Sequence, residues 1–212
     1  MSSTNRRRYS TFLSTILLPP VPLPFVVDDM PSFTPDSALD LLFDSSLIPN
    51  EVRKELAEGL HIRPLSSSDD TRGLFPVLST LSPSPTPARD NYAAHFQYMK
   101  RYSGIYFVIV IIDQSNDQVV GTGTVFMEHK LIRNLGVVGH IEDIVVSPKM
   151  QGKKLGLRII NTLTHISELQ GAYKTILNCS NENIPFYQKC GFKQKENEMA
   201  KYAEPKQPSP KL

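Results

Sequence analysis

Two periods of hydrophobic and polar residues divide the chain into strands and helices. Four stretches are rich in Val, Ile, Tyr and Phe or alternate between apolar and polar residues, as strands do: residues 61–65, 104–113, 118–128 and 136–146. A four-residue turn at 114–117 separates the second stretch from the third. We therefore expect these two stretches to form a β-hairpin.

Helical spacing is clearest in the C-terminal half. From Leu155 to about residue 170, apolar residues recur three or four positions apart, and Gly171 is placed to end the helix. Residues 90–101 predict an earlier helix, and shorter helical patterns occur at 36–44 and 51–60.

The last third of the chain continues this alternation. Residues 174–179 predict a short buried strand, 181–190 predict a helix ended by Gly191, and 199–202 predict a last strand. This order of strands and helices predicts an α/β domain with one central sheet.

Proline marks the domain boundary. Of 17 prolines, seven lie before residue 50, whereas only Pro148 and Pro185 lie between residues 90 and 203. Since proline interrupts helices and strands, we expect an irregular, proline-rich extension with short helices at 1–57, one domain at 58–203 and a disordered tail at 204–212.

Composition narrows the class of protein. The chain is 40% hydrophobic and 21% charged, with a formal net charge of +2, so it is typical of a globular protein and gives no sign of a nucleic-acid partner. Its two cysteines, Cys179 and Cys190, are too few for a disulfide scaffold and lack metal-ligand spacing. We expect two buried free thiols and no metal.

The N-terminal residues raise the question of targeting. Prolines break the longest apolar run, 12–27, so no integral membrane span is expected. Residues 1–27 contain no acidic residue and carry three arginines at 6–8, which resembles a weak transit peptide. A disordered extension or a wrongly assigned start are the alternatives. We expect a cytoplasmic protein and leave peripheral association with endomembranes open.

A glycine-containing turn at 151–156 joins the strand at 136–146 to the long helix. The free N–H groups of a helix start bind anions, glycine lets the backbone approach a phosphate, and Lys153 and Lys154 add positive charge. By itself the pattern also fits a tight structural turn.

A second motif decides between these interpretations. The run Asn183-Ile184-Pro185-Phe186-Tyr187-Gln188-Lys189-Cys190-Gly191-Phe192 follows the turn by about thirty residues. Together the two motifs resemble those of the GCN5-related N-acetyltransferases (GNAT), which have Gln/Arg-x-x-Gly-x-Gly/Ala at a helix start. Lys154 stands where the first glycine is usual, a departure that weakens the motif, because a non-glycine residue can serve there if its φ stays negative.

The resemblance narrows upstream. Residues 130–144 contain Gly-His-Ile-Glu-Asp and are similar to the eukaryotic, especially fungal, glucosamine 6-phosphate N-acetyltransferases. The similarity spans about residues 58–202 and is poor at 79–106, where that group has a longer, tryptophan-containing segment. It implies a GNAT fold: a central mixed, mostly antiparallel sheet flanked by helices, with an irregular N-terminal extension.

The resemblance also implies acetyl-CoA as co-substrate. The strand backbone would pair with the pantetheine amides, and the turn would hold the pyrophosphate. The implied coenzyme residues are Ile144, Val145, Val146, Gln151, Gly152, Lys153, Lys154, Leu155, Gly156, Leu157, Asn183 and Tyr187.

Three residues are the candidates for chemistry. By resemblance, Tyr187 would protonate the departing CoA sulfur, although a core tyrosine is the alternative. Glu142 and Asp143 are adjacent in a strand, so a regular strand would point them to opposite faces. We favour Glu142 for the amine and Asp143 for sugar hydroxyls and backbone positioning, with a solvated strand position as the alternative. The role of His140 stays open.

The phosphate of the sugar requires cations. Lys130 and Arg133 match the group's substrate loop, although a lone surface cation is more often simply solvated. The full set of implied acceptor residues is Ser79, Lys130, Leu131, Ile132, Arg133, Glu142, Asp143, Ile144, Tyr173, Lys174, Asn178 and Lys201.

The resulting hypothesis is direct acetyl transfer from acetyl-CoA to the amine of glucosamine 6-phosphate by a homodimer whose subunits share acceptor residues. The product would feed UDP-N-acetylglucosamine synthesis. Two alternatives are an acetyltransferase for another amine or a protein, since fold does not fix the acceptor, and a non-catalytic acyl-CoA-binding module.

Overall fold

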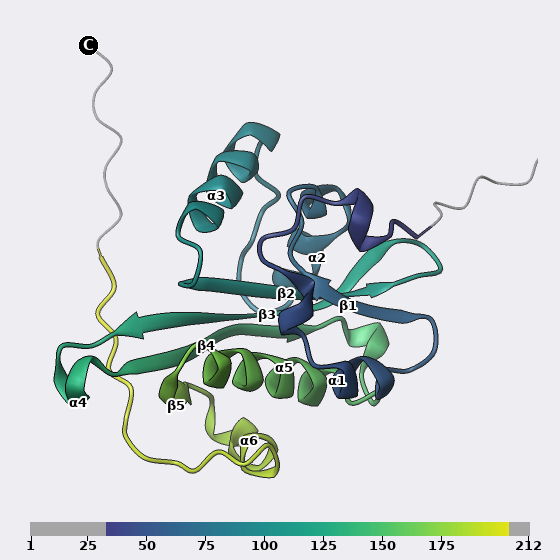
Figure 1. Ribbon diagram of the computed structural model, residues 1–212. Coiled ribbons are helices and arrows are strands. Elements are labelled where there is room, and N and C mark those ends of the chain that lie inside the picture. The colour runs from purple at the N-terminus through teal and green to yellow at the C-terminus, as the bar shows by residue number, and fades with distance from the viewer. Residues whose placement is uncertain (1–32, 204–212) are drawn as a thin grey trace, which may run out of the picture.

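One five-stranded sheet organises the protein. The computed structural model describes residues 33–203, so the transit-like segment and the tail at 204–212 lie outside the described residues. The strands are β1 (Leu60–Pro64), β2 (Tyr106–Asp113), β3 (Gln118–His129), β4 (Val137–Val146) and β5 (Ala172–Leu177). They lie in chain order, with only β4 and β5 parallel (Figure 1), which confirms the mixed, mostly antiparallel sheet.

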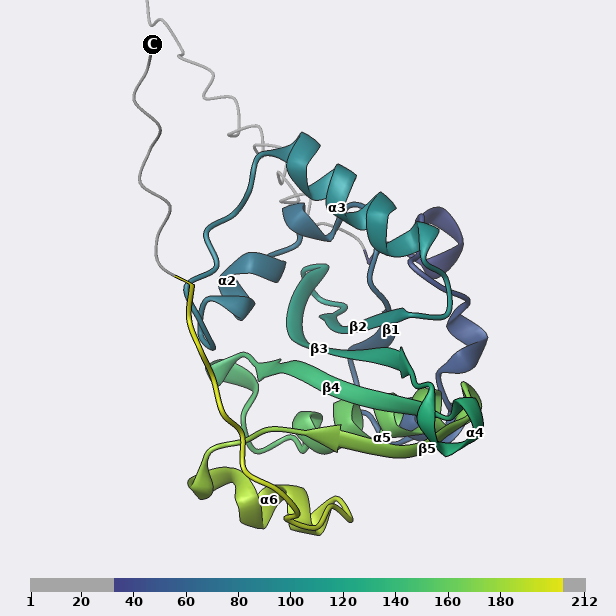
Figure 2. The same cartoon turned by 90° about the vertical axis from the view of Figure 1, so that its left-hand side faces the viewer.

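Helices cover both faces of this sheet (Figure 1 and Figure 2). On one face lies α5 (Leu155–Leu169), whose Ile159, Ile160, Leu163 and Ile166 are fully buried. On the other lie α2 (Leu74–Leu78) and α3 (Arg89–Arg101), and α3 contributes Tyr92 and Phe96 to a second apolar cluster. The remaining helices are short: α1 (Asn50–Lys54), α4 (Ile132–Leu135), α6 (Ile184–Lys189) and 3-10 turns at Asp36–Ala38, Ser45–Leu47, Asp69–Thr71, Pro148–Met150 and Asn181–Asn183.

Residues 33–59, the described part of the chain before β1, belong to the folded body. Ile48 and Val52 are 2% and 5% exposed and join the cluster under α5. The Leu42 N–H donates to the Leu65 carbonyl (2.8 Å), and the Thr34 hydroxyl donates to Asp117 (2.7 Å). The helical pattern at 36–44 forms only one 3-10 turn, and the expected helix at 51–60 stops at Lys54.

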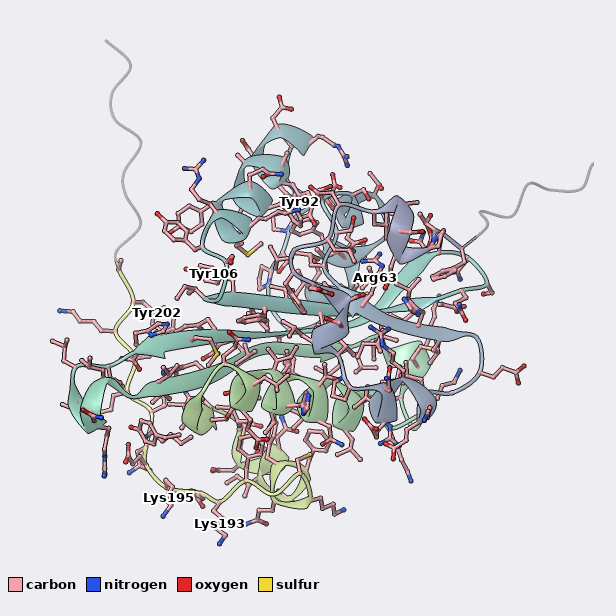
Figure 3. The ribbon with its side chains drawn as sticks, in the orientation of Figure 1. Arg63, Tyr92, Tyr106, Lys193, Lys195 and Tyr202 are labelled. Carbon is pink, nitrogen blue, oxygen red and sulfur yellow. The ribbon has the colours of Figure 1, made fainter. Side chains whose placement is uncertain are left out.

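A buried ion pair fixes the start of the sheet. Arg63 of β1, labelled in Figure 3, donates to both carboxylate oxygens of Asp69, at 2.8 and 2.7 Å. Both residues are fully buried. The Tyr92 hydroxyl donates to the Ser66 carbonyl beside them (2.7 Å). The pair joins β1 to the 3-10 turn at Asp69–Thr71, and removing one partner would leave an uncompensated buried charge.

A β-bulge interrupts β4 where the acidic residues lie. Thr124 pairs with Glu142 and Thr122 pairs with Val145, so Gly123 alone opposes both Asp143 and Ile144. Asp143 is in the left-handed region, with φ of 54°. Ile141 and Ile144 both pack toward α5, whereas Val145 packs on the other face. The regular alternation expected through Glu142 and Asp143 is therefore wrong.

Three further expectations are wrong because the residues concerned are exposed to solvent. The strand expected at 174–179 is β5, which lies at the sheet edge and is largely exposed rather than buried. Within residues 33–203, no strand forms at 199–202, and Met199 and Tyr202 are 95% and 91% exposed. Cys179 is exposed and Cys190 half-buried, so the two free thiols are not both in the core.

Candidate active site

The parallel strands β4 and β5 separate at the centre of the molecule. Their pairing ends at Ile141 and Leu177, so residues 142–146 pair only with β3. The opposite edge of this stretch offers backbone N–H and C=O groups in the gap between the strands. An extended ligand that carries amides can bind there as an added strand.

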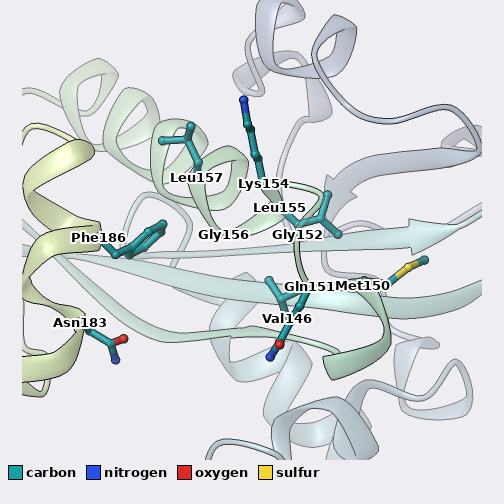
Figure 4. A pocket seen from close by; sticks show the side chains of 10 residues that line it. All are labelled: Val146, Met150, Gln151, Gly152, Lys154, Leu155, Gly156, Leu157, Asn183 and Phe186. Atoms are coloured by element: carbon teal, nitrogen blue, oxygen red, sulfur yellow. The ribbon is translucent and has the colours of Figure 1, made fainter.

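An open cavity of about 350 Å³ continues this gap (Figure 4). Its lining comes from the end of β4, the following turn, the first turn of α5 and the start of α6: Val146, Met150, Gln151, Gly152, Lys154, Leu155, Gly156, Leu157, Asn183 and Phe186. No side chain caps the N-terminus of α5. Its first N–H groups therefore remain free to bind an anion such as a phosphate.

The turn before α5 corrects one expectation. Lys154 has φ of 58° and ψ of 22°, so it adopts the left-handed conformation, not a negative φ. Gly152, two residues earlier, has φ of 84°. For a residue with a Cβ this conformation costs about 1–2 kcal/mol. Here a lysine adopts the backbone geometry for which glycine is usual.

The cavity contains most, but not all, of the expected coenzyme residues. Ile144 packs its side chain under Gly123, and Val145 is buried on the opposite face, so each can serve a ligand only through its backbone. Neither Lys153 nor Tyr187 lines the cavity, whereas Met150 and Phe186 do and were not expected. Phe186 lies within the second motif, but its contact with α5 depends on how α6 packs.

Tyr187 lies on α6 among aromatic rings. Its ring centroid is 5.0 Å from that of Phe186 and 6.2 Å from that of Phe192. Burial raises the pKa of its phenol, and nearby Cys179, Cys190 and Glu142 raise it further when charged. The hydroxyl is therefore protonated at neutral pH, as a proton donor must be.

Glu142 and Asp143 are consecutive, exposed residues of β4. Burial raises the pKa of Glu142, and the charges of Asp143 and Glu198 add to this effect, while His140 opposes it. A carboxyl that releases its proton less readily than usual is suited to exchange a proton with an amine. The fold thus places Glu142 and Asp143 next to each other where β4 and β5 separate, and Tyr187, on α6, is near enough to Glu142 for that charge to raise the pKa of its phenol.

The expected acceptor loop lies at the far tip of the β3–β4 hairpin. Arg133, Asn134 and Leu135 form a left-handed turn, with φ of 55°, 55° and 59°. Tyr173 packs beside it, because a Cβ on Gly136 would lie 3.0 Å from the Tyr173 ring. The Lys130 ammonium is 2.7 Å from the Glu128 carboxylate.

This tip is remote from Glu142 of the same chain. The Lys130 N–H donates to the Gly136 carbonyl, six residues before Glu142 on β4. At about 3.3 Å per residue the backbone of the tip is about 20 Å from that of Glu142, although the Lys130 side chain reaches back to Glu128, whose other oxygen contacts His140. Ser79 is at the end of α2 and donates to the Ser84 carbonyl, Asn178 follows β5, and Lys201 lies in the irregular tail. One chain therefore does not gather all expected acceptor residues around one sugar.

Sequence comparison identifies the fold family. Residues 73–192 match the acetyltransferase (GNAT) family. The chain belongs to this family. GNAT acetyltransferases use acetyl-CoA, and the gap, the cavity and the uncapped helix start provide the amide edge and the anion site that such a ligand needs.

Individual relatives agree with the family match. A glucosamine 6-phosphate N-acetyltransferase from Dictyostelium discoideum is 40% identical, over 68% of this chain and 92% of its own. The crystal structure of the Arabidopsis thaliana enzyme of that name superposes with a TM-score of 0.67 at 35% identity, covering 68% of this chain and 99% of that one. An acetyltransferase from Trypanosoma brucei has a TM-score of 0.63 at 33% identity, with the same coverage.

Two kinds of feature are absent from residues 33–203. That part of the chain holds no group of three or more His, Cys, Asp and Glu residues arranged to bind a metal. In the same range, no helix is long and apolar enough to cross a membrane.

Proposed function

We propose that this protein transfers the acetyl group of acetyl-CoA to the amine of glucosamine 6-phosphate, giving N-acetylglucosamine 6-phosphate and CoA. The edge of β4 that β5 leaves unpaired beyond Ile141, next to Glu142, carries the proposal. The names of the relatives from Dictyostelium discoideum and Arabidopsis thaliana support this choice of acceptor.

Each part of the site has a task in this reaction. Acetyl-CoA supplies the activated acetyl thioester. The free edge of β4 aligns its amides, and the start of α5 holds its phosphates. Glu142 receives the acceptor amine and accepts its proton. Tyr187 stays protonated and donates to the departing thiolate.

We further propose that two copies of the chain complete each other's site. Arg133 is at the tip of the hairpin, where the backbone is about 20 Å along the strand from Glu142 of its own chain, so we infer that it holds the phosphate of a sugar bound in another subunit. The Lys130 ammonium lies nearer, because it contacts Glu128, which also contacts His140. The tip of the hairpin also exposes large apolar side chains that a partner would cover: Leu131 (91% exposed), Ile132 (64%), Leu135 (70%) and Tyr173 (48%).

Release of the CoA thiol tests the acceptor. The purified protein receives acetyl-CoA with glucosamine 6-phosphate, unphosphorylated glucosamine or a lysine-containing peptide. We expect turnover with the phosphorylated sugar at least about 100-fold above the other two, because loss of a charge-assisted contact costs about 3 kcal/mol or more. Preferential turnover of the peptide would refute this acceptor. Binding of acetyl-CoA without turnover of any acceptor would support the acyl-CoA-binding alternative.

A further inference from the structure

A single carboxylate joins two groups that the proposed mechanism treats separately. Glu128, near the end of β3, contacts the Lys130 ammonium through Oε1 (2.7 Å) and Nε2 of the His140 ring through Oε2 (2.9 Å). Both carboxylate oxygens are therefore engaged. The hydrogen bond from Lys130, and then that from His140, lowers the pKa of Glu128, so this carboxylate stays charged.

The His140 ring is also held on its flat side. It stacks on Phe126 with a centroid distance of 4.6 Å and an interplanar angle of 15°. Phe126 and His140 are directly opposite each other on β3 and β4, and Glu128 is opposite Val138. All these side chains thus stand on paired strands, a more rigid support than a loop.

His140 in turn stands next to Glu142. The two residues are separated by one position in the regular part of β4, before the bulge at Asp143, so they share a face of the sheet and lie about 7 Å apart. The positive charge of a protonated His140 lowers the pKa of Glu142, whereas the negative charges of Asp143 and Glu198 raise it. The state of the imidazole therefore affects the carboxylate that receives the amine.

We propose that Glu128 is a positioning residue for acetyl transfer: its carboxylate fixes the proton of His140 on Nε2 and holds the ring beside Glu142. A carboxylate only accepts hydrogen bonds, so it requires a proton on the nitrogen that it contacts. The inference rests on the proposed function, in which Glu142 receives the amine. Glu128 also holds Lys130, so it links the tip of the hairpin to the centre of the site.

The variant Glu128→Gln separates positioning from folding. Glutamine has nearly the same shape and can still bond both neighbours, but its amide can donate to Nε2 and so allow the His140 proton to move to Nδ1. Glu168→Gln, an exposed change on the outside of α5, is the matched control. His140→Gln and the double variant Glu128→Gln/His140→Gln complete a cycle.

The kinetic arm measures kcat and KM with glucosamine 6-phosphate. We expect Glu128→Gln to lower kcat about tenfold or more, with the KM for acetyl-CoA unchanged, because a misplaced group slows the chemical step. Because both changes act through one ring, the double variant should be no slower than His140→Gln alone. Two results would overturn the proposal. The first is a double variant whose fold-loss in kcat equals the product of the two single fold-losses. The second is a kcat of Glu128→Gln equal to that of Glu168→Gln.

The spectroscopic experiment locates the ring proton of His140 directly and requires no acceptor substrate. In nitrogen NMR of the histidine rings, the signal missing from His140→Gln belongs to His140. We expect its proton on Nε2 in the native protein and redistribution toward Nδ1 in Glu128→Gln; an identical pattern in both would refute the role of Glu128. If the native protein fails to acetylate glucosamine 6-phosphate, the proposed acceptor is wrong, and this arm still decides whether Glu128 fixes the ring.

Discussion

At the scale of single residues, environment changes what a side chain can do. A tyrosine in an aromatic cluster is usually a core residue, and Tyr187 has core neighbours in Phe186 and Phe192. Its position within electrostatic reach of Glu142 distinguishes it from such a residue. The same burial that packs the ring raises the pKa of its phenol and preserves the proton that the reaction requires.

Replacing Tyr187 with phenylalanine tests this role. The ring and its packing are retained and only the proton donor is lost, so we expect kcat to fall about 100-fold while the affinity for acetyl-CoA stays the same. Steady-state kinetics and calorimetric binding measure the two quantities. Tyr98→Phe on α3 is the control. If the Tyr187 variant keeps the native kcat, Tyr187 is a packing residue.

The pH dependence of the reaction depends on Glu142. Its raised pKa places the acidic limb of the kcat/KM profile above the ordinary glutamate range. Glu198→Gln removes one of the charges that disfavour ionisation of Glu142. Ionisation then occurs more readily, so we expect the acidic limb to move to lower pH. A limb that stays in place would show that Glu142 does not set it.

Lys154 tests the cost of a left-handed residue. Its φ of 58° suits glycine. We therefore expect Lys154→Gly to stabilise the fold by about 1 kcal/mol in urea unfolding. The complementary change, Gly152→Ala, places a Cβ at φ of 84° and should destabilise the fold by about 1 kcal/mol. Destabilisation by Lys154→Gly would indicate that the lysine side chain makes a compensating interaction.

At the scale of elements, the bulge in β4 determines the site. It adds one residue opposite Gly123, turns Ile144 toward α5, and leaves Glu142 and Asp143 in an exposed stretch where β4 and β5 separate. A bulge of this kind bends a strand and re-aims its side chains without ending the sheet. The same local irregularity thus opens the ligand edge and places the carboxylates next to it.

Gly123→Ala would disturb the bulge selectively. The added Cβ would lie 2.5 Å from Ile144 Cδ1 and 2.6 Å from Ile159 Cγ2. We expect a loss of about 1–3 kcal/mol in unfolding free energy and a lower kcat in the folded fraction. Gly121→Ala, on the same strand, meets its nearest atom at 3.3 Å and should be milder in both measurements. Equal effects of the two changes would argue against a special role for the bulge.

At the scale of the whole molecule, one chain carries two halves of a site. The coenzyme cavity and Glu142 lie along β4, whereas Arg133 is at the tip of a hairpin whose backbone is about 20 Å away. In a dimer with two-fold symmetry, contacts are reciprocal. If the tip of one chain reaches the centre of its partner, the partner's tip reaches the centre of the first chain in the same way.

Mixing two inactive variants tests this arrangement. Glu142→Gln and Arg133→Ala should each have little activity alone. If the hairpin tip serves the partner, each mixed dimer contains one intact site, so refolding the two variants together at equal amounts should restore about a quarter of native activity. Native protein refolded in parallel is the control. Absence of recovery, with mixed dimers demonstrated by mass spectrometry, would mean that the tip does not act across subunits.

Local patterns in the sequence determined much of this molecule. The periodicity of Val, Ile and Leu positions predicted the strands β1 to β4 and helix α5, because burying one face of each element is the main driving force of folding. The turn around Gly156 predicted an anion site, because the free N–H groups of a helix start bind phosphate; the family and the cofactor class came from the resemblance of this turn and the motif around Tyr187 to a known family. A resemblance to a known family, not periodicity, supplied the acceptor.

Tertiary structure decided what depends on neighbours distant in the sequence. Pairing with β3 creates the bulge at Asp143, and packing of α6 brings Phe186 to the cavity. The tail at 199–202 had a strand-like sequence but no paired strand within the described chain, and a strand without a partner leaves its backbone hydrogen bonds unmade. The sequence by itself determined which chemistry the chain can carry; only the arrangement of its strands decided which residues meet, because register and bulges arise from pairing between segments far apart in the chain.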